Sequence, residues 1–400
     1  MKRLILSLLA LLTLGSLLPL QGRGLPRYPF LKMEQNVLQY PAGRSPEMEC
    51  FFNKLDTLLR TGGGDVRVLH VGGSHVQGGS WSNRLRQDFL SLRYGMDGGR
   101  GLVFPFATAS TNTPSGYSSS CMGKWESATC LKPGDYQIGV TGVAAMAMDT
   151  TARAIIDLLP KESQILLQRY TFNKVDVIGS GEMEPVLLMG PRDTLFGVFG
   201  KNVCHFDLPH YTDWLQLAFK GKGTYTLRGI YLDKPGGGFT YVEAGINGAS
   251  TRSWTQCELW EQDLQRVHPD LVIFSIGIND IQGNEFESNR FKAHYRTLIK
   301  QIRRVNPRCA ILFTGINDSW RKRNPNPLTI AAEDAFRELA KEYNAVFWDW
   351  FEVMGGFGSM ATWQEAGLAQ SDKVHCTQTG YRLVGDLLFE AIMDSYYLSR

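Results

Sequence analysis

The chain has 400 residues, which is long enough for two domains of ordinary size. Apolar residues make up 43% of the sequence and charged residues 20%, as in globular proteins rather than disordered chains. The net charge of +3 and the scattered basic residues exclude the broad basic stripe of a nucleic-acid-binding protein, so we expect no nucleic-acid partner. Arg321-Lys322-Arg323 is a local basic run and is interpreted as a solvated loop, the alternative being a polyanion site.

The N-terminus has the pattern of an export signal. Met1-Lys2-Arg3 is a short positive region, and residues 4–20 are mostly apolar. We therefore predict a signal peptide over residues 1–22, a secreted or periplasmic protein, and no stable membrane span after cleavage. The alternative is an uncleaved membrane anchor. The apolar stretch, at about 17 residues, is at the lower limit for crossing a bilayer, and Pro19 weakens it further.

Residues 23–105 are predicted to open an α/β domain. Residues 25–45 contain prolines and no periodicity, which is typical of an N-terminal arm. Residues 47–60 have helical spacing of apolar side chains and end at a glycine run. Residues 66–71 are a short apolar run, as expected for a buried strand, and residues 80–94 again have helical spacing.

The pattern changes to short strands between residues 106 and 238. This stretch is rich in Gly, Ser and Thr, and turn residues separate its short apolar or alternating runs. Strands are predicted at 154–159, 164–172, 184–188, 214–219 and 225–232. Since no long amphipathic helix is seen, we predict that residues 106–238 form a β-sandwich domain inserted into the α/β domain.

The α/β pattern returns over residues 239–400, the predicted second part of the first domain. Five predicted strands, counting 66–71, alternate with helices along the chain, which indicates a parallel sheet with helices on both faces. The strands after the insert are predicted at 241–244, 271–276, 310–314 and 345–348. The helices are predicted at 250–267, 286–305, 329–343 and 379–398.

Four short motifs lie where such a sheet would place an active site, beyond the carboxyl ends of its strands. They are Gly72-Gly73-Ser74-His75, Gly245-Ile246-Asn247-Gly248, Gly277-Ile278-Asn279-Asp280 and Asp372-Lys373-Val374-His375. Each motif is short, but four in this order, each beside a predicted strand or helix, are hard to obtain by chance.

Ser74, His375 and Asp372 have the chemistry of a serine triad. Asp372 and His375 lie three residues apart just before the last helix, and one helical turn would place both on one side. The carboxylate could then fix the imidazole tautomer while the other ring nitrogen faces the Ser74 hydroxyl. The alternatives for the single residues are a plain turn serine and a solvated helix start capped by Asp372.

Asn279 is the candidate oxyanion donor, because a side-chain amide can stabilise a developing negative charge together with backbone N–H groups. A second copy of its motif, Gly315-Ile316-Asn317-Asp318, follows the next predicted strand. Asn279 is preferred because it follows the apolar strand at the expected place after the Gly248 motif. Asn317 is expected to line the rim or cap a turn. His75, beside Ser74, could touch substrate or pack in the turn.

The four motifs resemble the conserved blocks of the SGNH (GDSL-like) hydrolases, whose letters would here be Ser74, Gly248, Asn279 and His375. Within that family the chain is similar to bacterial peptidoglycan O-acetylesterases. The similarity covers about residues 65–100 and 240–395 and includes, beyond the blocks, Trp348-Asp349-Trp350, Met354-Gly355-Gly356, Ser359-Met360, Trp363 and Gly380-Tyr381.

The resemblance implies a flavodoxin-like three-layer sandwich around the parallel sheet. It also implies an all-β insert of the jelly-roll or carbohydrate-binding-module type. The N–H groups of Ser74 and Gly248 and the side chain of Asn279 would hold the oxyanion, and no metal or other cofactor is needed. One position departs from the family, which usually has Asp where this chain has Gly73. That aspartate is not the triad acid but helps to shape the turn, so the serine geometry could be looser here.

The resulting hypothesis is an exported serine esterase that removes O-acetyl groups from a glycan, peptidoglycan being the expected substrate. Alternatives of the same class are an esterase or acetyltransferase for another polysaccharide. An alternative of a different class is a glycan-binding protein whose esterase site has decayed, for which Gly73 is the sequence hint.

Overall fold

The computed structural model describes residues 28–158, 170–283 and 285–400. The predicted signal peptide therefore lies outside the described residues, as does most of the strand predicted at 164–172. Within the described ranges, no helix is both long and apolar enough to cross a membrane.

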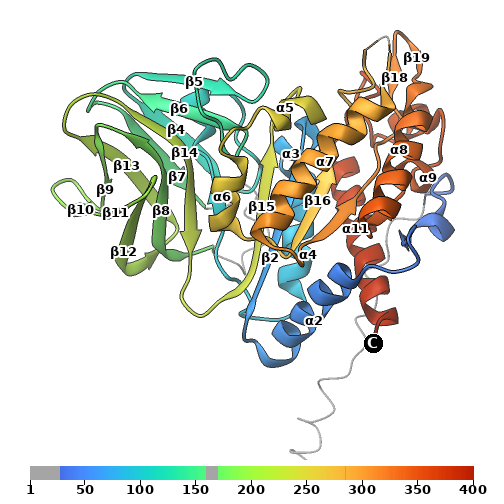
Figure 1. Cartoon of the computed structure of the whole chain (residues 1–400), viewed down its shortest axis with the longest axis horizontal. Coiled ribbons are helices and arrows are strands. Elements are labelled where there is room, and N and C mark those ends of the chain that lie inside the picture. The colour runs from blue at the N-terminus through green and yellow to red at the C-terminus, as the bar shows by residue number, and fades with distance from the viewer. Residues whose placement is uncertain (1–27, 159–169, 284) are drawn as a thin grey trace, which may run out of the picture.

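A six-stranded sheet forms the centre of the α/β part, in the order β1-β20-β17-β16-β2-β15 (Figure 1). The five predicted strands are confirmed and all run parallel, and β1 adds to the β20 edge in the antiparallel direction. Their chain order within the sheet is 2-1-3-4-5, which is the flavodoxin-like order. The strands are β1 (Leu38–Gln39), β2 (Asp65–Gly72), β15 (Gly238–Gly245), β16 (Leu271–Ser275), β17 (Ala310–Phe313) and β20 (Val346–Trp348).

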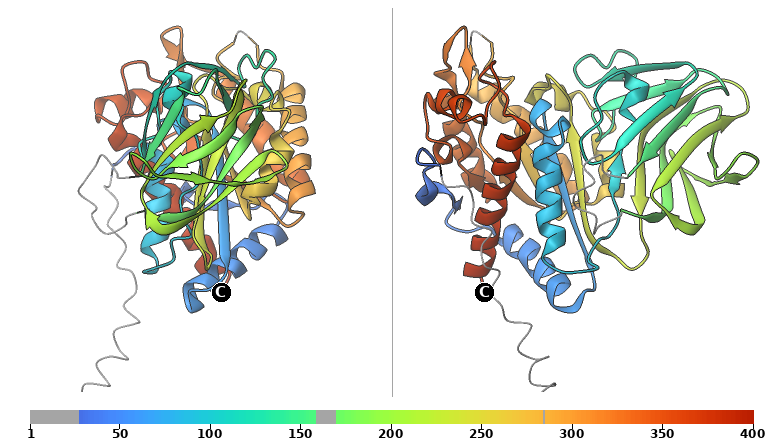
Figure 2. Two further views of the ribbon diagram at one scale, coloured as in Figure 1. Left: turned by 90° about the vertical axis from the view of Figure 1, so that its left-hand side faces the viewer. Right: turned by 180° about the vertical axis from the view of Figure 1, so that it is seen from behind.

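Helices cover both faces of this sheet. Helices α6, α7 and α8 lie in front of it in Figure 1, whereas α4 and α11 pack together behind it, as the reverse view in Figure 2 shows. The longer helices are α2 (Pro46–Thr61), α4 (Ser80–Ser91), α6 (Trp260–Val267), α7 (Ser288–Val305), α8 (Leu328–Tyr343) and α11 (Gln378–Leu398). The predicted helix ends are explained by caps: the Ser45 side chain accepts from Met48 N–H, and Gly62 ends α2 with a φ of 76°.

The single helix predicted over residues 250–267 is wrong. The chain instead forms α5 (Thr251–Thr255) and α6, with residues 256–259 between them. The break has a tertiary cause: the N–H of Leu259 donates to the Ile138 carbonyl at 2.9 Å, in the β-rich region, rather than to a carbonyl of its own helix. Short elements that the sequence did not indicate are α3 (Ser74–Gln77), α9 (Trp350–Val353), α10 (Ser359–Glu365), and the hairpin of β18 (Trp320–Arg321) and β19 (Asn324–Pro325).

Between α4 and β15 the chain forms antiparallel strands, which agrees in part with the predicted β insert. One sheet has the order β10-β9-β13-β7-β4 and a second the order β11-β12-β8-β14-β6-β5, with β3 paired to β14. The strands are β3 (Gly101–Val103), β4 (Ser118–Met122), β5 (Trp125–Thr129), β6 (Val143–Ala147), β7 (Arg153–Asp157), β8 (Phe172–Gly181), β9 (Glu184–Leu188), β10 (Thr194–Phe196), β11 (Val198–Gly200), β12 (Val203–Thr212), β13 (Trp214–Lys220) and β14 (Tyr225–Asp233). Pairing begins at β3, before residue 106. The jelly-roll or carbohydrate-binding type of this β region stays a prediction.

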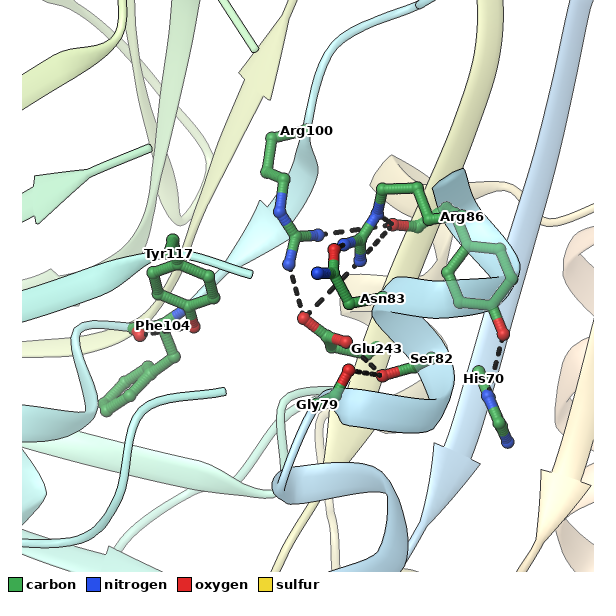
Figure 3. Close-up of polar contacts among 10 residues, drawn as sticks. His70, Gly79, Ser82, Asn83, Arg86, Arg100, Phe104, Tyr117 and Glu243 are labelled. Atoms are coloured by element: carbon green, nitrogen blue, oxygen red, sulfur yellow. Dashed lines mark hydrogen bonds and ion pairs between the residues drawn. The ribbon is translucent and has the colours of Figure 1, made fainter. Parts of the chain in front are cut away.

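A buried charge cluster joins the β region to the α/β part (Figure 3). Glu243 of β15 pairs with Arg86 of α4, at 3.4 Å, and with Arg100, which leads into β3. Both guanidinium groups also donate to the Tyr241 carbonyl, and the Arg100 guanidinium lies 5.2 Å from the ring centre of Tyr117. The side chains of Arg86, Arg100 and Glu243 are at most 3% exposed, so a charge left without its partner here would be costly.

Candidate active site

Ser74 lies at a sharp turn from strand to helix, where β2 ends at Gly72 and α3 begins at Ser74. Glycine is required at position 72, because a Cβ there would lie 2.2 Å from the Val76 side chain and 2.9 Å from the Ser275 carbonyl. The Gly73 carbonyl then accepts from the N–H groups of Val76 and Gln77. The turn therefore presents Ser74, partly exposed, beyond the carboxyl end of β2.

The structure brings Ser74, His375 and Asp372 together in one line of hydrogen bonds. The Ser74 Oγ lies 2.8 Å from Nε2 of His375, and Nδ1 of the same ring lies 2.7 Å from Oδ2 of Asp372. His375 and Asp372 retain side-chain exposures of 34% and 46%. With the carboxylate accepting at Nδ1, the unprotonated Nε2 faces the serine hydroxyl, which is the tautomer that a general base needs.

The spacing of Asp372 and His375 predicted that they share a helical turn, and this prediction is wrong. They lie in a loop over residues 370–377, here called the His375 loop, which comes before α11 begins at Gln378. The Asp372 Oδ1 accepts from the N–H groups of Val374 and His375, at 2.9 and 3.0 Å, and so folds the loop around the carboxylate. Partial burial acts to raise the pKa of Asp372, but the bonds from His375 and Val374 outweigh it and hold that pKa below its usual range.

The His375 loop is fixed from outside by contacts with other loops. The Asn317 side chain donates to the Val374 carbonyl at 2.9 Å, and the Trp320 N–H donates to the Lys373 carbonyl at 3.0 Å. Asn317 is 1% exposed, so it is a buried support of the loop rather than a rim residue. The sequence offered one signal for this role, the second copy of the Gly-Ile-Asn-Asp motif.

His75 packs beneath the triad. Its ring lies 5.2 Å from the His375 ring, centre to centre, and its Nδ1 lies 2.5 Å from the Tyr381 hydroxyl. The Tyr381 oxygen accepts from the Cys376 N–H, so its own proton is available to His75. Burial, with a smaller effect from His375, lowers the pKa of His75 to about 3, while Asp372 acts in the opposite direction. His75 therefore stays neutral and links the serine turn to the His375 loop.

Asn279 and the turn that contains Gly248 both lie beside Gly73. The Asn279 Nδ2 donates to the Ala249 carbonyl at 2.8 Å, and a Cβ on Gly73 would lie 3.4 Å from that Nδ2. Gly248 is exposed, with a φ of 78°. Asn279 thus lies beside the serine turn, and one of its two amide hydrogens is left for another acceptor. Its role as the oxyanion donor stays a prediction.

The β region forms part of the surroundings of Ser74. The Gln77 side chain of α3 donates to the Asn112 carbonyl at 3.0 Å and accepts from the Asn247 N–H at 2.6 Å. The side chains of Asn247 and Asn112 are also hydrogen-bonded, at 2.6 Å. Leu131, 40% exposed, is the neighbour that a side chain at Gly248 would meet. Residues before β4 and after β5 thus lie next to the serine turn.

The GDSL-like Lipase/Acylhydrolase family matches residues 211–383, a range that contains Gly248, Asn279, Asp372 and His375. No curated protein sequence matches the chain.

A solved structure of a peptidoglycan O-acetylesterase is similar to this chain, with 23% identity and a TM-score of 0.72 over 90% of this chain and 99% of that one. A lipase/acylhydrolase from Enterococcus faecalis is 18% identical, with a TM-score of 0.31 over 40% of this chain and 77% of that one. A catalytic mutant of an acetylxylan esterase from Geobacillus stearothermophilus is 23% identical, with a TM-score of 0.32 over 39% and 73%.

The first of these likenesses shows the fold over nearly the whole chain, and the family match covers the segments that follow the serine turn. Within that fold, the hydrogen-bonded Ser74, His375 and Asp372 supply the groups that ester hydrolysis needs. Residues 211–383 of this chain match the GDSL-like lipase/acylhydrolase family, and the chain has the fold of a solved peptidoglycan O-acetylesterase.

Proposed function

We propose that the protein is an exported acetylesterase that removes O-acetyl groups from peptidoglycan through an acyl-enzyme on Ser74. The observation that carries the chemistry is the unbroken line from Ser74 through His375 to Asp372, at 2.8 and 2.7 Å. The substrate is supported by the fold shared with a peptidoglycan O-acetylesterase over both the α/β part and the β region.

The reaction begins when Ser74 Oγ attacks the acetyl carbonyl and His375 Nε2 takes the serine proton. Asp372 holds the ring orientation and stabilises the imidazolium that forms. The N–H groups of Ser74 and Gly248 and the Asn279 side chain hold the oxyanion. Protonated His375 returns its proton to the departing sugar oxygen. Water activated by the same base then releases acetate from Ser74.

An acetate-release assay tests this proposal. The wild-type protein is incubated with O-acetylated peptidoglycan and with the same material after base treatment, which removes the esters. We expect acetate only from the first, and none with the Ser74→Ala variant. Hydrolysis of small acetyl esters without any release from O-acetylated peptidoglycan would leave an esterase whose substrate is another polysaccharide.

The decayed-site alternative is weakened by the geometry, because the departure at Gly73 leaves the hydrogen bonds of Ser74 and His375 in place. Labelling with an active-site organophosphonate distinguishes an active esterase from a glycan-binding protein with a decayed site. We expect one label per chain, on Ser74, whereas a binding protein with a dead site would stay unlabelled.

Export is proposed from the basic start and apolar run of residues 1–20. N-terminal sequencing of the protein recovered from the cell envelope or the medium tests it. A mature chain that begins near residue 23 is expected, and a chain that retains Met1 would contradict cleavage.

A further inference from the structure

Three basic residues have a backbone conformation that L residues rarely adopt; one lies in the His375 loop and two lie in the β18–β19 hairpin that contacts this loop. Lys322, Arg323 and Lys373 have φ values of 49°, 72° and 52°. They are three of the seven non-glycine residues with positive φ in the described ranges. Such conformations are unfavourable for L residues and persist where the surrounding structure enforces them, often at functional sites.

Lys322 and Arg323 form the two-residue turn of the β18–β19 hairpin, in which Arg321 pairs with Asn324. A two-residue turn with positive φ at both positions favours Asn-Gly, since these residues tolerate the left-handed region. This chain has a lysine and an arginine instead. The local backbone preference therefore does not explain their presence at the tip.

The hairpin is held between the two loops that carry the reacting groups. On one side the Trp320 N–H donates to the Lys373 carbonyl at 3.0 Å, and the Lys373 ammonium lies 3.6 Å from the Trp320 ring centre. On the other side the Arg321 side chain donates to the Gln282 carbonyl at 3.1 Å, and Asn326 donates to the Ile281 carbonyl at 2.9 Å. Figure 1 shows β18 and β19 at the same end of the molecule as α3.

The tip is positively charged and exposed. Lys322 and Arg323 are both exposed, and no salt bridge of Lys322, Arg323 or Lys373 occurs in the part of the chain that the structure describes. An acetyl ester is neutral, so these cations have no use in attacking it. They suit an anionic group carried elsewhere on the same substrate molecule.

We propose that Lys322, Arg323 and Lys373 form a rim that binds a carboxylate of the glycan substrate while Ser74 attacks its acetyl ester. This inference rests on the proposed function and makes it more specific. Peptide stems give peptidoglycan free carboxylates, whereas a neutral acetylated polysaccharide has none. The rim would therefore favour anionic glycopeptide over neutral glycan.

The test uses a variant that removes charge but suits the turn, Lys322→Asn with Arg323→Gly. Its control, Lys300→Gln with Lys341→Gln, removes the same charge from exposed positions on α7 and α8. The probes are soluble O-acetylated peptidoglycan fragments, the same fragments with carboxylates amidated by carbodiimide and methylamine, and 4-nitrophenyl acetate. Amidation neutralises carboxylates but not phosphates. An effect that amidation removes therefore depends on a carboxylate.

We expect the hairpin variant to raise KM for the native fragments by about three- to tenfold at low ionic strength, with kcat unchanged. The difference should vanish in high salt and with amidated fragments. Hydrolysis of 4-nitrophenyl acetate and the Tm should not fall, because Asn-Gly fits the turn. The control variant should behave as the wild type.

An unchanged KM for the native fragments in the hairpin variant would overturn the proposal. An equal rise in KM for the amidated fragments would also overturn it. Loss of 4-nitrophenyl acetate hydrolysis would also overturn it, since the hairpin would then build the reacting site. If the wild type releases no acetate from either polymer yet cleaves 4-nitrophenyl acetate, the proposed function itself fails.

Discussion

The side-chain amide of Asn317 donates to the carbonyl of Val374 at 2.9 Å, one residue before His375. Asn317 and Asn279 come from two copies of one motif, at the ends of neighbouring strands β17 and β16. Asn279 lies next to Gly73 in the serine turn, whereas Asn317 is buried and supports the histidine loop. The two copies thus lie beside the two loops of the candidate site, the serine turn and the His375 loop.

Alanine substitutions at Asn279 and Asn317 should have different effects on kcat and on stability. Asn279→Ala is expected to lower kcat by roughly 10²–10³, the usual effect of removing one oxyanion donor, with little change in Tm. Asn317→Ala should lower kcat much less but lower the unfolding free energy by about 1–3 kcal/mol, because it leaves buried carbonyls without a donor. Kinetics with a small ester and thermal melts of both variants check this. The reverse pattern would mean that Asn317 is the oxyanion donor.

Ser74→Ala and His375→Ala should each abolish ester hydrolysis, with losses of roughly 10⁴–10⁶ in kcat, while circular dichroism stays that of the wild type. Asp372→Asn should lose less than either, because nucleophile and base remain and only the orientation of the ring suffers. Near wild-type turnover in the serine or histidine variant would refute the mechanism.

Alanine at Gly72 and at Gly73 should have opposite outcomes. At Gly72 a Cβ would meet Val76 at 2.2 Å and the Ser275 carbonyl at 2.9 Å, so we expect a loss of about 1–3 kcal/mol in stability. At Gly73 the nearest atoms lie at 3.4 Å and φ is −96°, so alanine should be tolerated. Gly73→Asp, which restores the residue usual in the family, should remain active. Urea unfolding of the variants and ester hydrolysis by Gly73→Asp decide the matter.

Glu243→Gln tests the charge cluster at the junction with the β region. It leaves Arg86 and Arg100 buried without their carboxylate, and we expect a loss of about 3–5 kcal/mol in unfolding free energy. The matched control is Glu126→Gln, which breaks the exposed Lys124–Glu126 pair at 3.9 Å and should change stability by less than about 1 kcal/mol. Equal stabilities in urea would show that the cluster does not hold the two regions together.

The pH dependence of the unfolding free energy should include a contribution from Asp280. Burial raises the pKa of Asp280 to about 6, although hydrogen bonds from Thr251 oppose the shift. Between the ordinary value of 3.8 and about 6, the folded protein binds more protons than the unfolded chain, so this group makes stability fall as pH rises. Asp280→Asn removes that effect.

The unfolding free energy of Asp280→Asn, relative to the wild type, should therefore improve by up to about 3 kcal/mol between pH 4 and pH 7. Urea titrations at pH 4, 5, 6 and 7 measure the difference. Two curves that stay parallel across this range would contradict the assignment.

The sequence by itself predicted the parallel sheet, because strands such as β16 and β17 are short apolar runs that alternate with amphipathic helices, and this pattern is local. It also pointed to Ser74, His375, Asp372, Gly248 and Asn279, since each stands at the end of such an element. Their catalytic roles stay predictions, as do the domain boundaries, but the first three are hydrogen-bonded to one another in the fold.

Only the tertiary structure decided how the site is held. The bond of Asn317 to Val374 joins residues 57 apart, and the contact of His75 with Tyr381 joins residues 306 apart. No local pattern encodes such pairs. The break between α5 and α6 is likewise set by the distant Ile138 carbonyl. Periodicity fixes which segments become strands and helices, whereas the packing of loops on one another fixes the geometry of the triad.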